Sequence, residues 1–104
     1  MKYATARNFA LSLAEVSEAP HHDYGSFRVR GRIFVTVPPR RTHLHVFVAD
    51  SEREQALAMY PQFVDKLLWG GKVVGVRVAL EPAPAAAVKT LIRQAWQHKA
   101  TGKR

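Results

Sequence analysis

The sequence contains no cysteine, which excludes a disulfide-stapled scaffold. It also lacks any uncharged apolar stretch near the ~18 residues that a membrane-spanning helix needs. The apolar run at residues 8–14 includes Asn8 and Ser12 and is closed by Glu15, so it makes a poor hydrophobic core for an export signal. These absences predict a cytoplasmic protein without membrane association.

Acidic side chains are also few. Eight Asp and Glu stand against sixteen Lys and Arg, which leaves a formal net charge of +8 at pH 7. The hydrophobic share of 47% is too high for a disordered chain, and a length of 104 residues fits one domain. A folded domain with this excess of positive charge attracts polyanions, so nucleic acid is the first partner to consider. We expect the chain to be a monomer.

Three stretches have apolar residues at helical spacing. They predict a first helix over residues 5–14, a second over residues 51–60 and a third in the C-terminal part of the chain. Thr5 is the residue type of an N-cap for the first helix. Ser51-x-x-Glu54 has the spacing of a capping box for the second helix.

Between and after these helices the apolar residues alternate, which is the pattern of half-buried strands. The predicted strands cover residues 26–29, 33–37, 43–48 and 73–80, with another short apolar run at residues 67–69. The order is helix, three or four strands, helix, two strands, helix, which predicts an α+β fold with a mainly antiparallel sheet. We expect one compact domain over residues 1–104, with residues 99–104 as a frayed basic tail.

The turn at residues 30–32 leaves two strand registers open. A two-residue turn pairs Phe27 with Phe34 and puts Arg32 on the apolar face. A three-residue loop pairs Phe27 with Val35 and keeps that arginine out of the apolar face. We favour the three-residue loop because it produces one consistent apolar face.

Several short segments between about residues 10 and 96 share a particular order and spacing. They are Pro20-His21, Ser26-Phe27-Arg28-Val29 leading through Gly31 to Ile33-Phe34, Trp69-Gly70 ahead of Val76-Arg77-Val78, and Ala95-Trp96. As a set they resemble the MmcQ/YjbR-like family of small bacterial proteins. This resemblance implies a compact α+β domain with helices packed against a sheet. It also implies DNA binding through two projecting hairpins, or wings, and it carries over no catalytic or base-reading residue.

Two clusters of arginine fall where such wings are predicted. Arg30 and Arg32 lie at the tip of the first hairpin, and Arg40 and Arg41 follow two prolines in the next loop. We interpret these four arginines as candidate phosphate contacts, with solvated loop tips as the alternative explanation of their charge. Three further cations complete the candidate nucleic-acid site, on the predicted sheet or in its turns: Arg28, Lys72 and Arg77.

Aromatic residues have two interpretations. Phe34 and Phe47 share the outer sheet face with basic residues in one of them, where they stack bases as in single-strand binding proteins. In the other the last helix covers that face and makes them core residues. We favour the core assignment, and for the same reason we interpret Trp69 and Trp96 as packing residues.

Histidines are the candidate metal ligands. His43 and His45 are two apart on one predicted strand and therefore share a face, and His21 joins them if its segment lies alongside. The alternative is a set of polar residues on a half-exposed sheet, which we favour. We therefore predict no metal and no cofactor.

Catalytic motifs are not apparent in the sequence. It has no Gly-x-Ser-x-Gly elbow, and its Gly70-Gly71-Lys72 turn lacks the spacing of a phosphate-binding loop. We therefore expect a protein that is not an enzyme and that binds DNA through basic hairpin tips. A protein-interaction or chaperone-like domain is the alternative, and a histidine-based metal protein is the third possibility.

Overall fold

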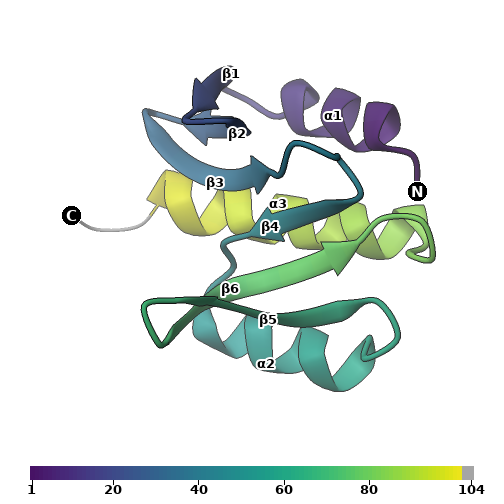
Figure 1. Ribbon diagram of the computed structural model, residues 1–104. Helices are drawn as coiled ribbons and strands as arrows, with labels where there is room; N and C mark the ends of the chain where they lie inside the picture. The colour runs from purple at the N-terminus through teal and green to yellow at the C-terminus, as the bar shows by residue number, and fades with distance from the viewer. Residues whose placement is uncertain (102–104) are drawn as a thin grey trace.

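The computed structural model describes residues 1–101, within which three helices alternate with six strands (Figure 1). In chain order they are α1 (Tyr3–Ser12), β1 (Val16–His21), β2 (Tyr24–Val29), β3 (Arg32–Val37), β4 (His43–Val46), α2 (Asp50–Met59), β5 (Val64–Trp69), β6 (Lys72–Ala79) and α3 (Ala85–Thr101). This order confirms the predicted α+β fold and its arrangement of helix, four strands, helix, two strands, helix.

The strands form one antiparallel sheet in the order β1-β2-β3-β4-β6-β5. The first four strands follow one another as a meander, so each pairs with the next along the chain. After α2, the hairpin of β5 and β6 folds back so that β6 pairs with β4. This places β1 and β5 at the two edges of the sheet.

The helices cover one face of the sheet. α3 packs on β2, β3 and β4, α2 packs on β5 and β6, and α1 packs on β1 and α3. Figure 1 shows α3 and α2 behind the sheet, with the opposite face toward the viewer. We call that opposite face the helix-free face. None of the helices in the described part of the chain has the length and hydropathy that crossing a membrane requires.

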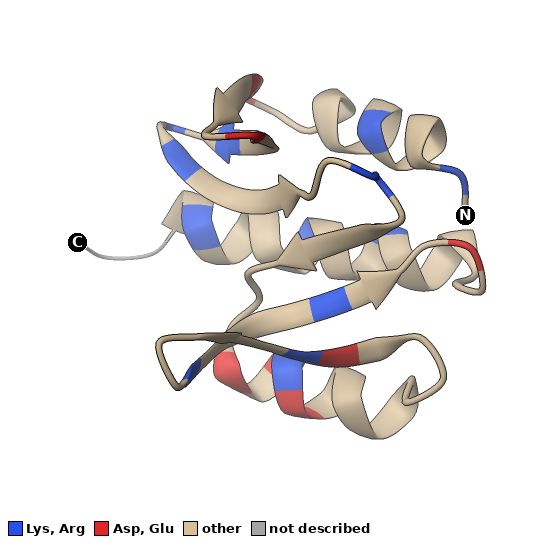
Figure 2. Ribbon diagram, viewed as in Figure 1, with Lys and Arg blue, Asp and Glu red and all other residues tan. Residues whose placement is uncertain are grey.

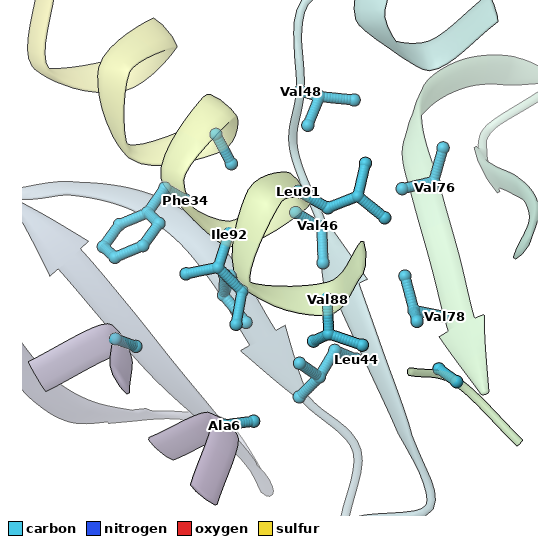
Figure 3. Close-up of a cluster of buried hydrophobic side chains, with 14 of the residues drawn as sticks. Ala6, Phe34, Leu44, Val46, Val48, Val76, Val78, Val88, Leu91 and Ile92 are labelled. Carbon is cyan, nitrogen blue, oxygen red and sulfur yellow. The ribbon is translucent and has the colours of Figure 1, made fainter. Parts of the chain in front are cut away.

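The core lies between α3 and the sheet. The alternation of the strands sends one set of apolar side chains toward the helices, where they meet the apolar stripe of α3. Figure 3 shows this contact, which includes Phe34, Leu44, Val46, Val76, Val78, Val88, Leu91 and Ile92. Phe34 is therefore a core residue, as the sequence indicated.

The β2–β3 hairpin differs from its expected loop. Arg30 and Gly31 form a two-residue turn with φ angles of 53° and 80°, as in a type I′ turn, so the predicted three-residue loop is wrong. A register shift between Phe27 and Arg28 then introduces a β-bulge. Because of this bulge Phe27 pairs with Val35, which is the pairing that we favoured for a different reason.

The helix ends also differ from those expected. Thr5 lies inside α1, which begins at Tyr3 because that side chain packs against the core. Asp50 precedes Ser51 in α2, so no capping box forms, and the acidic residues of the first turn favour the helix through its dipole instead. α3 continues through residues 99–101, which we expected in a frayed tail, and the rest of that tail lies outside the described residues.

Candidate nucleic-acid interface

One row of residues crosses all six strands on the helix-free face. The strand registers place its members opposite one another in the order Ala19, Ser26, Thr36, His45, Arg77 and Asp65. This row alternates with the core residues of the same strands, so its side chains project away from the helices. It ends in two charged residues at the β6–β5 side of the sheet.

The centre of this row buries polar side chains. Ser26, Thr36 and His45 are the buried polar residues of the described chain, with 0%, 1% and 7% of their surface exposed. The Ser26 hydroxyl donates a hydrogen bond of 2.7 Å to the carbonyl of Ala19 and accepts one of 3.2 Å from Arg28 Nε. By contrast, Thr36 Oγ1 and His45 Nδ1 have no hydrogen-bond partner within residues 1–101.

The ring of Tyr24 helps to bury this pair. Its centroid lies 5.9 Å from that of His45, and the residue belongs to the β1–β2 end of the sheet. An unpaired buried polar atom is costly, because it has lost its hydrogen bonds to water without replacement. Two such atoms on facing residues therefore mark a place where a water or a ligand atom fits.

Phe47 and Trp69 form an aromatic pair beyond these residues, in which Phe47 is buried, as the sequence indicated, and Trp69 is not. Trp69 is 48% exposed, and its ring centroid lies 5.3 Å from that of Phe47 in an edge-on contact. The prediction that Trp69 is a packing residue is therefore wrong, because it sits near the end of an edge strand where the core does not reach. Trp96 does pack against the core, as expected.

Two hollows lie beside Trp69, and the larger of them also reaches Lys99 near the end of α3. The smaller has a volume of about 310 Å³ and is lined by Thr36, Trp69 and residues 21–24. The larger, of about 430 Å³, is lined by His21, Ile33, Phe47, Trp69, Val74 and Lys99. His21 and Trp69 line both, although they belong to opposite edge strands. The sheet therefore curls so that its two edges both approach the hollows.

The histidines are divided between two places. His43 and His45 are neighbours of Arg77 on the helix-free face, and the pKa of each is lowered, first by burial and then by that guanidinium. His21 lies against His22, with ring centroids 4.8 Å apart. Within residues 1–101 no group of three or more His, Cys, Asp or Glu side chains is arranged to hold a metal ion, so His21 does not complete a site with the other two.

Arg28, Arg77 and Lys72 border the aromatic and polar residues of this face. Arg28 donates to the hydroxyl of Ser26 and to the carbonyl of Pro20, at 3.4 Å, and Arg77 is exposed near the β5 end of the row, opposite Asp65. Lys72 is exposed where the β5–β6 turn meets β6, next to Trp69 in the strand register. The strand registers therefore place these three candidate cations on β2 and β6, around the row of polar residues, although none of them lines either hollow.

Arg30 and Arg32, in contrast, contact other parts of the protein, although the Arg30 side chain remains 64% exposed. Arg30 forms an ion pair of 2.9 Å with Glu15 and approaches the carbonyl of Ala100 at 3.4 Å. Arg32 donates to the carbonyl of Lys99 at 3.3 Å. The contacts with Ala100 and Lys99 are made to backbone carbonyls in the last described turn of α3, where a helix leaves carbonyls without partners of its own. This hairpin tip therefore supports the C-terminal end of α3.

Arg40 and Arg41 lie at the other end of β3. The guanidinium of Arg41 sits 5.0 Å from the centre of the Tyr3 ring, and a hollow of about 240 Å³ beside it is also lined by Glu18 and Asp23. β3 has six residues, so the two arginine clusters are roughly 20 Å apart. Figure 2 shows the lysines and arginines spread over several elements, with acidic residues on α2 and β5.

The fold and this face define a small α+β domain with one side of its sheet free of helices and lined by basic and aromatic residues. A family model described as YjbR matches residues 11–98, so the chain belongs to the YjbR family. The resemblance seen in the sequence is thereby confirmed. No curated protein and no solved structure matches the chain.

Proposed function

We propose that the chain binds single-stranded nucleic acid across the helix-free face, as a binding protein rather than an enzyme. The observation that carries this proposal is Trp69, which is half exposed, packs edge-on against the buried ring of Phe47, and lines a hollow with Thr36 on the face that also carries Arg28 and Arg77. Stacking of bases on aromatic rings stabilises such complexes by about 1–3 kcal/mol per base and needs unpaired bases. The surrounding cations attract the phosphates, in a chain whose net charge is +8.

The hairpin tips support this proposal less strongly than the face does. Arg30 and Arg32 already contact Glu15 and the end of α3. Acidic residues line the hollow next to Arg41 and weaken its attraction for phosphate. We therefore assign the tips the weaker part of the electrostatic attraction, and the face the main contact.

The first test measures binding directly. Fluorescence anisotropy of a labelled ten-nucleotide single strand, at about 50 mM salt, compares the wild type with Trp69→Ala and Arg77→Gln. We expect Trp69→Ala to weaken binding by roughly 5- to 100-fold through lost stacking. The matched control is Arg93→Gln, which removes the same charge from an exposed position of α3 on the other side of the sheet. Its effect on affinity should be clearly smaller than that of Arg77→Gln.

The salt dependence of affinity shows whether the phosphate contacts come from the helix-free face or from the hairpin tips. Each phosphate contact with a single strand contributes about −0.7 to the slope of log affinity against log salt. Arg40→Ala combined with Arg41→Ala should change this slope less than Arg28→Gln combined with Arg77→Gln. If the loop pair has the larger effect, the tips carry the contact and the face does not. Absence of binding to any strand or duplex at low salt would overturn the proposal as a whole.

A protein partner is the second candidate, and β5 favours it. This edge strand exposes Leu68 and Trp69, at 57% and 48%, and its outer backbone groups have no neighbouring strand within the described chain. An extended peptide can add to such an edge. A hydrogen-exchange experiment distinguishes a protein partner from nucleic acid. Addition of a strand protects the backbone amides of β5 from exchange, whereas nucleic acid protects amides of the strands near Thr36.

A further inference from the structure

We infer that one base of the bound strand inserts into the smaller hollow, between the His21–Tyr24 turn and Trp69, where Thr36 and His45 recognise its hydrogen-bonding edge. This inference rests on the proposed function and adds a base-reading site to it. The hollow measures about 310 Å³, at the small end of the range for ligand sites. It is therefore large enough for a single planar group.

The walls of the hollow suit a flat aromatic ligand. Four of the residues that line it carry rings, namely His21, His22, Tyr24 and Trp69, and Asp23 is its acidic member. A flat heterocycle inserted here meets aromatic rings, as splayed bases do in single-strand binding proteins. Thr36 also lines this hollow, and only 1% of its surface is exposed.

Two polar side chains next to the hollow have atoms that are free to form further hydrogen bonds. Thr36 Oγ1 and His45 Nδ1 have no partner within the described chain, although their residues are opposite each other on β3 and β4. A hydroxyl both donates and accepts, and a neutral imidazole offers one donor and one acceptor. Together they match the mixed edge of a base, which also carries donors and acceptors. Burial and Arg77 lower the pKa of His45, which keeps its ring neutral near pH 7.

Tyr24 controls access to this pair. Its ring is tilted by 51° to that of His45 at a centroid distance of 5.9 Å, and Tyr24 lines the hollow whereas His45 does not. A side-chain rotation at Tyr24 would expose His45 to the inserted base without a change in the strands. Ser26, the third buried polar residue of the row, has its hydroxyl already bonded to Ala19 and is not available for the same role.

The test compares ten-nucleotide strands made only of dA, dC or dT, with the anisotropy assay described above. We expect the wild type to bind its best strand at least about 10-fold more tightly than its worst, as unpaired polar groups discriminate between ligand edges. Thr36→Val keeps the shape of the side chain and removes the hydroxyl, and should reduce this ratio to below about 3-fold. The control Thr90→Val removes a hydroxyl on α3 that bonds to Ala86, and should keep the full ratio.

The possible results distinguish a failure of the base-reading site from a failure of nucleic-acid binding as a whole. If no strand binds, the proposed function fails first. If all three strands bind equally, or if Thr36→Val retains the wild-type ratio, the function stands and the base-reading site is wrong. In that case an ordered water satisfies Thr36 and His45. A second readout uses the wild type alone: the ring signals of His45 in NMR should shift with a strand that carries bases and not with an abasic strand.

Discussion

The indole Nε1 of Trp96 donates a hydrogen bond of 3.0 Å to the carbonyl of Ala14, 82 positions earlier in the chain. The bond ties α3 to the connection between α1 and β1, while the ring packs against the core without being fully buried. Two elements that are distant in sequence are thus fixed by one side chain.

Substitution of Trp96 separates its two contributions. Trp96→Phe keeps an aromatic ring and loses the hydrogen bond, and should lower the free energy of unfolding by about 1 kcal/mol. Trp96→Ala also loses the packing and should cost about 3 kcal/mol. Urea unfolding followed by circular dichroism measures both. Trp69→Phe is the comparison, because that ring is half exposed and the change should stay within about 0.5 kcal/mol.

Thr36 and Ser26 should respond in opposite directions when their hydroxyls are removed. Thr36→Val replaces an unpaired buried hydroxyl by a methyl group and should stabilise the fold by about 1 kcal/mol. Ser26→Ala breaks the 2.7 Å bond to Ala19 and removes one of the two hydrogen-bond partners of Arg28, and should destabilise by about 1–2 kcal/mol. Thermal or urea unfolding of both variants checks this, and a loss of stability in Thr36→Val would show that its hydroxyl is paired in solution.

Stability should fall on the acid side of neutrality. Burial, then Arg77, then His43 lower the pKa of His45, and burial and Arg77 act on His43 in the same direction. Below about pH 6.5 the unfolded chain therefore binds protons that the folded protein does not, and the free energy of unfolding decreases with falling pH. Arg77→Gln removes one cause and should make this decrease shallower. Urea titrations at pH 5, 6, 7 and 8 compare the two proteins, and parallel curves would contradict the role of Arg77.

Gly75 and Gly25 should differ sharply in their tolerance of alanine. A Cβ on Gly75 would stand 2.4 Å from the carbonyl oxygen of Val46, which is backbone and cannot move away without disturbing β4. Gly75→Ala should therefore cost more than about 2 kcal/mol or prevent folding. A Cβ on Gly25 meets Val37 at an ordinary contact distance of 3.7 Å. Gly25→Ala should fold normally, and similar losses in both variants would argue against a close approach at Gly75.

Much of the fold could be predicted from the spacing of hydrophobic residues in the sequence. The strands and helices are recognisable because buried residues such as Val76 and Leu91 recur at the spacing of their elements. The β2–β3 turn could not be predicted in this way. A bulge that leaves Phe34 without a partner on β2 gives Phe27 the same pairing with Val35 that a longer loop would also produce. The start of α1 was missed because Tyr3 extends the helix through tertiary packing rather than through a capping side chain.

Only part of the candidate site could be predicted from the sequence. The alternation of His43 and His45 showed that they share a face, but no local pattern reveals that β6 rather than β5 lies beside β4. Arg77 therefore could not be placed next to His45, nor Trp69 near His21, before the sheet order was known. The position of Thr36 between Val35 and Val37, in the apolar part of β3, was the signal for the buried polar row.

The length of β3 sets the smallest footprint that can engage both ends of this protein. Its six residues hold the Arg30 turn and the Arg40 loop roughly 20 Å apart. Stacked nucleotides advance by about 3.4 Å each, so a strand needs about six of them to reach from one end to the other. Oligonucleotides of about four nucleotides should occupy the aromatic surface without touching both loops. Affinity should then rise in a step, rather than evenly, as the strand is lengthened past about six nucleotides.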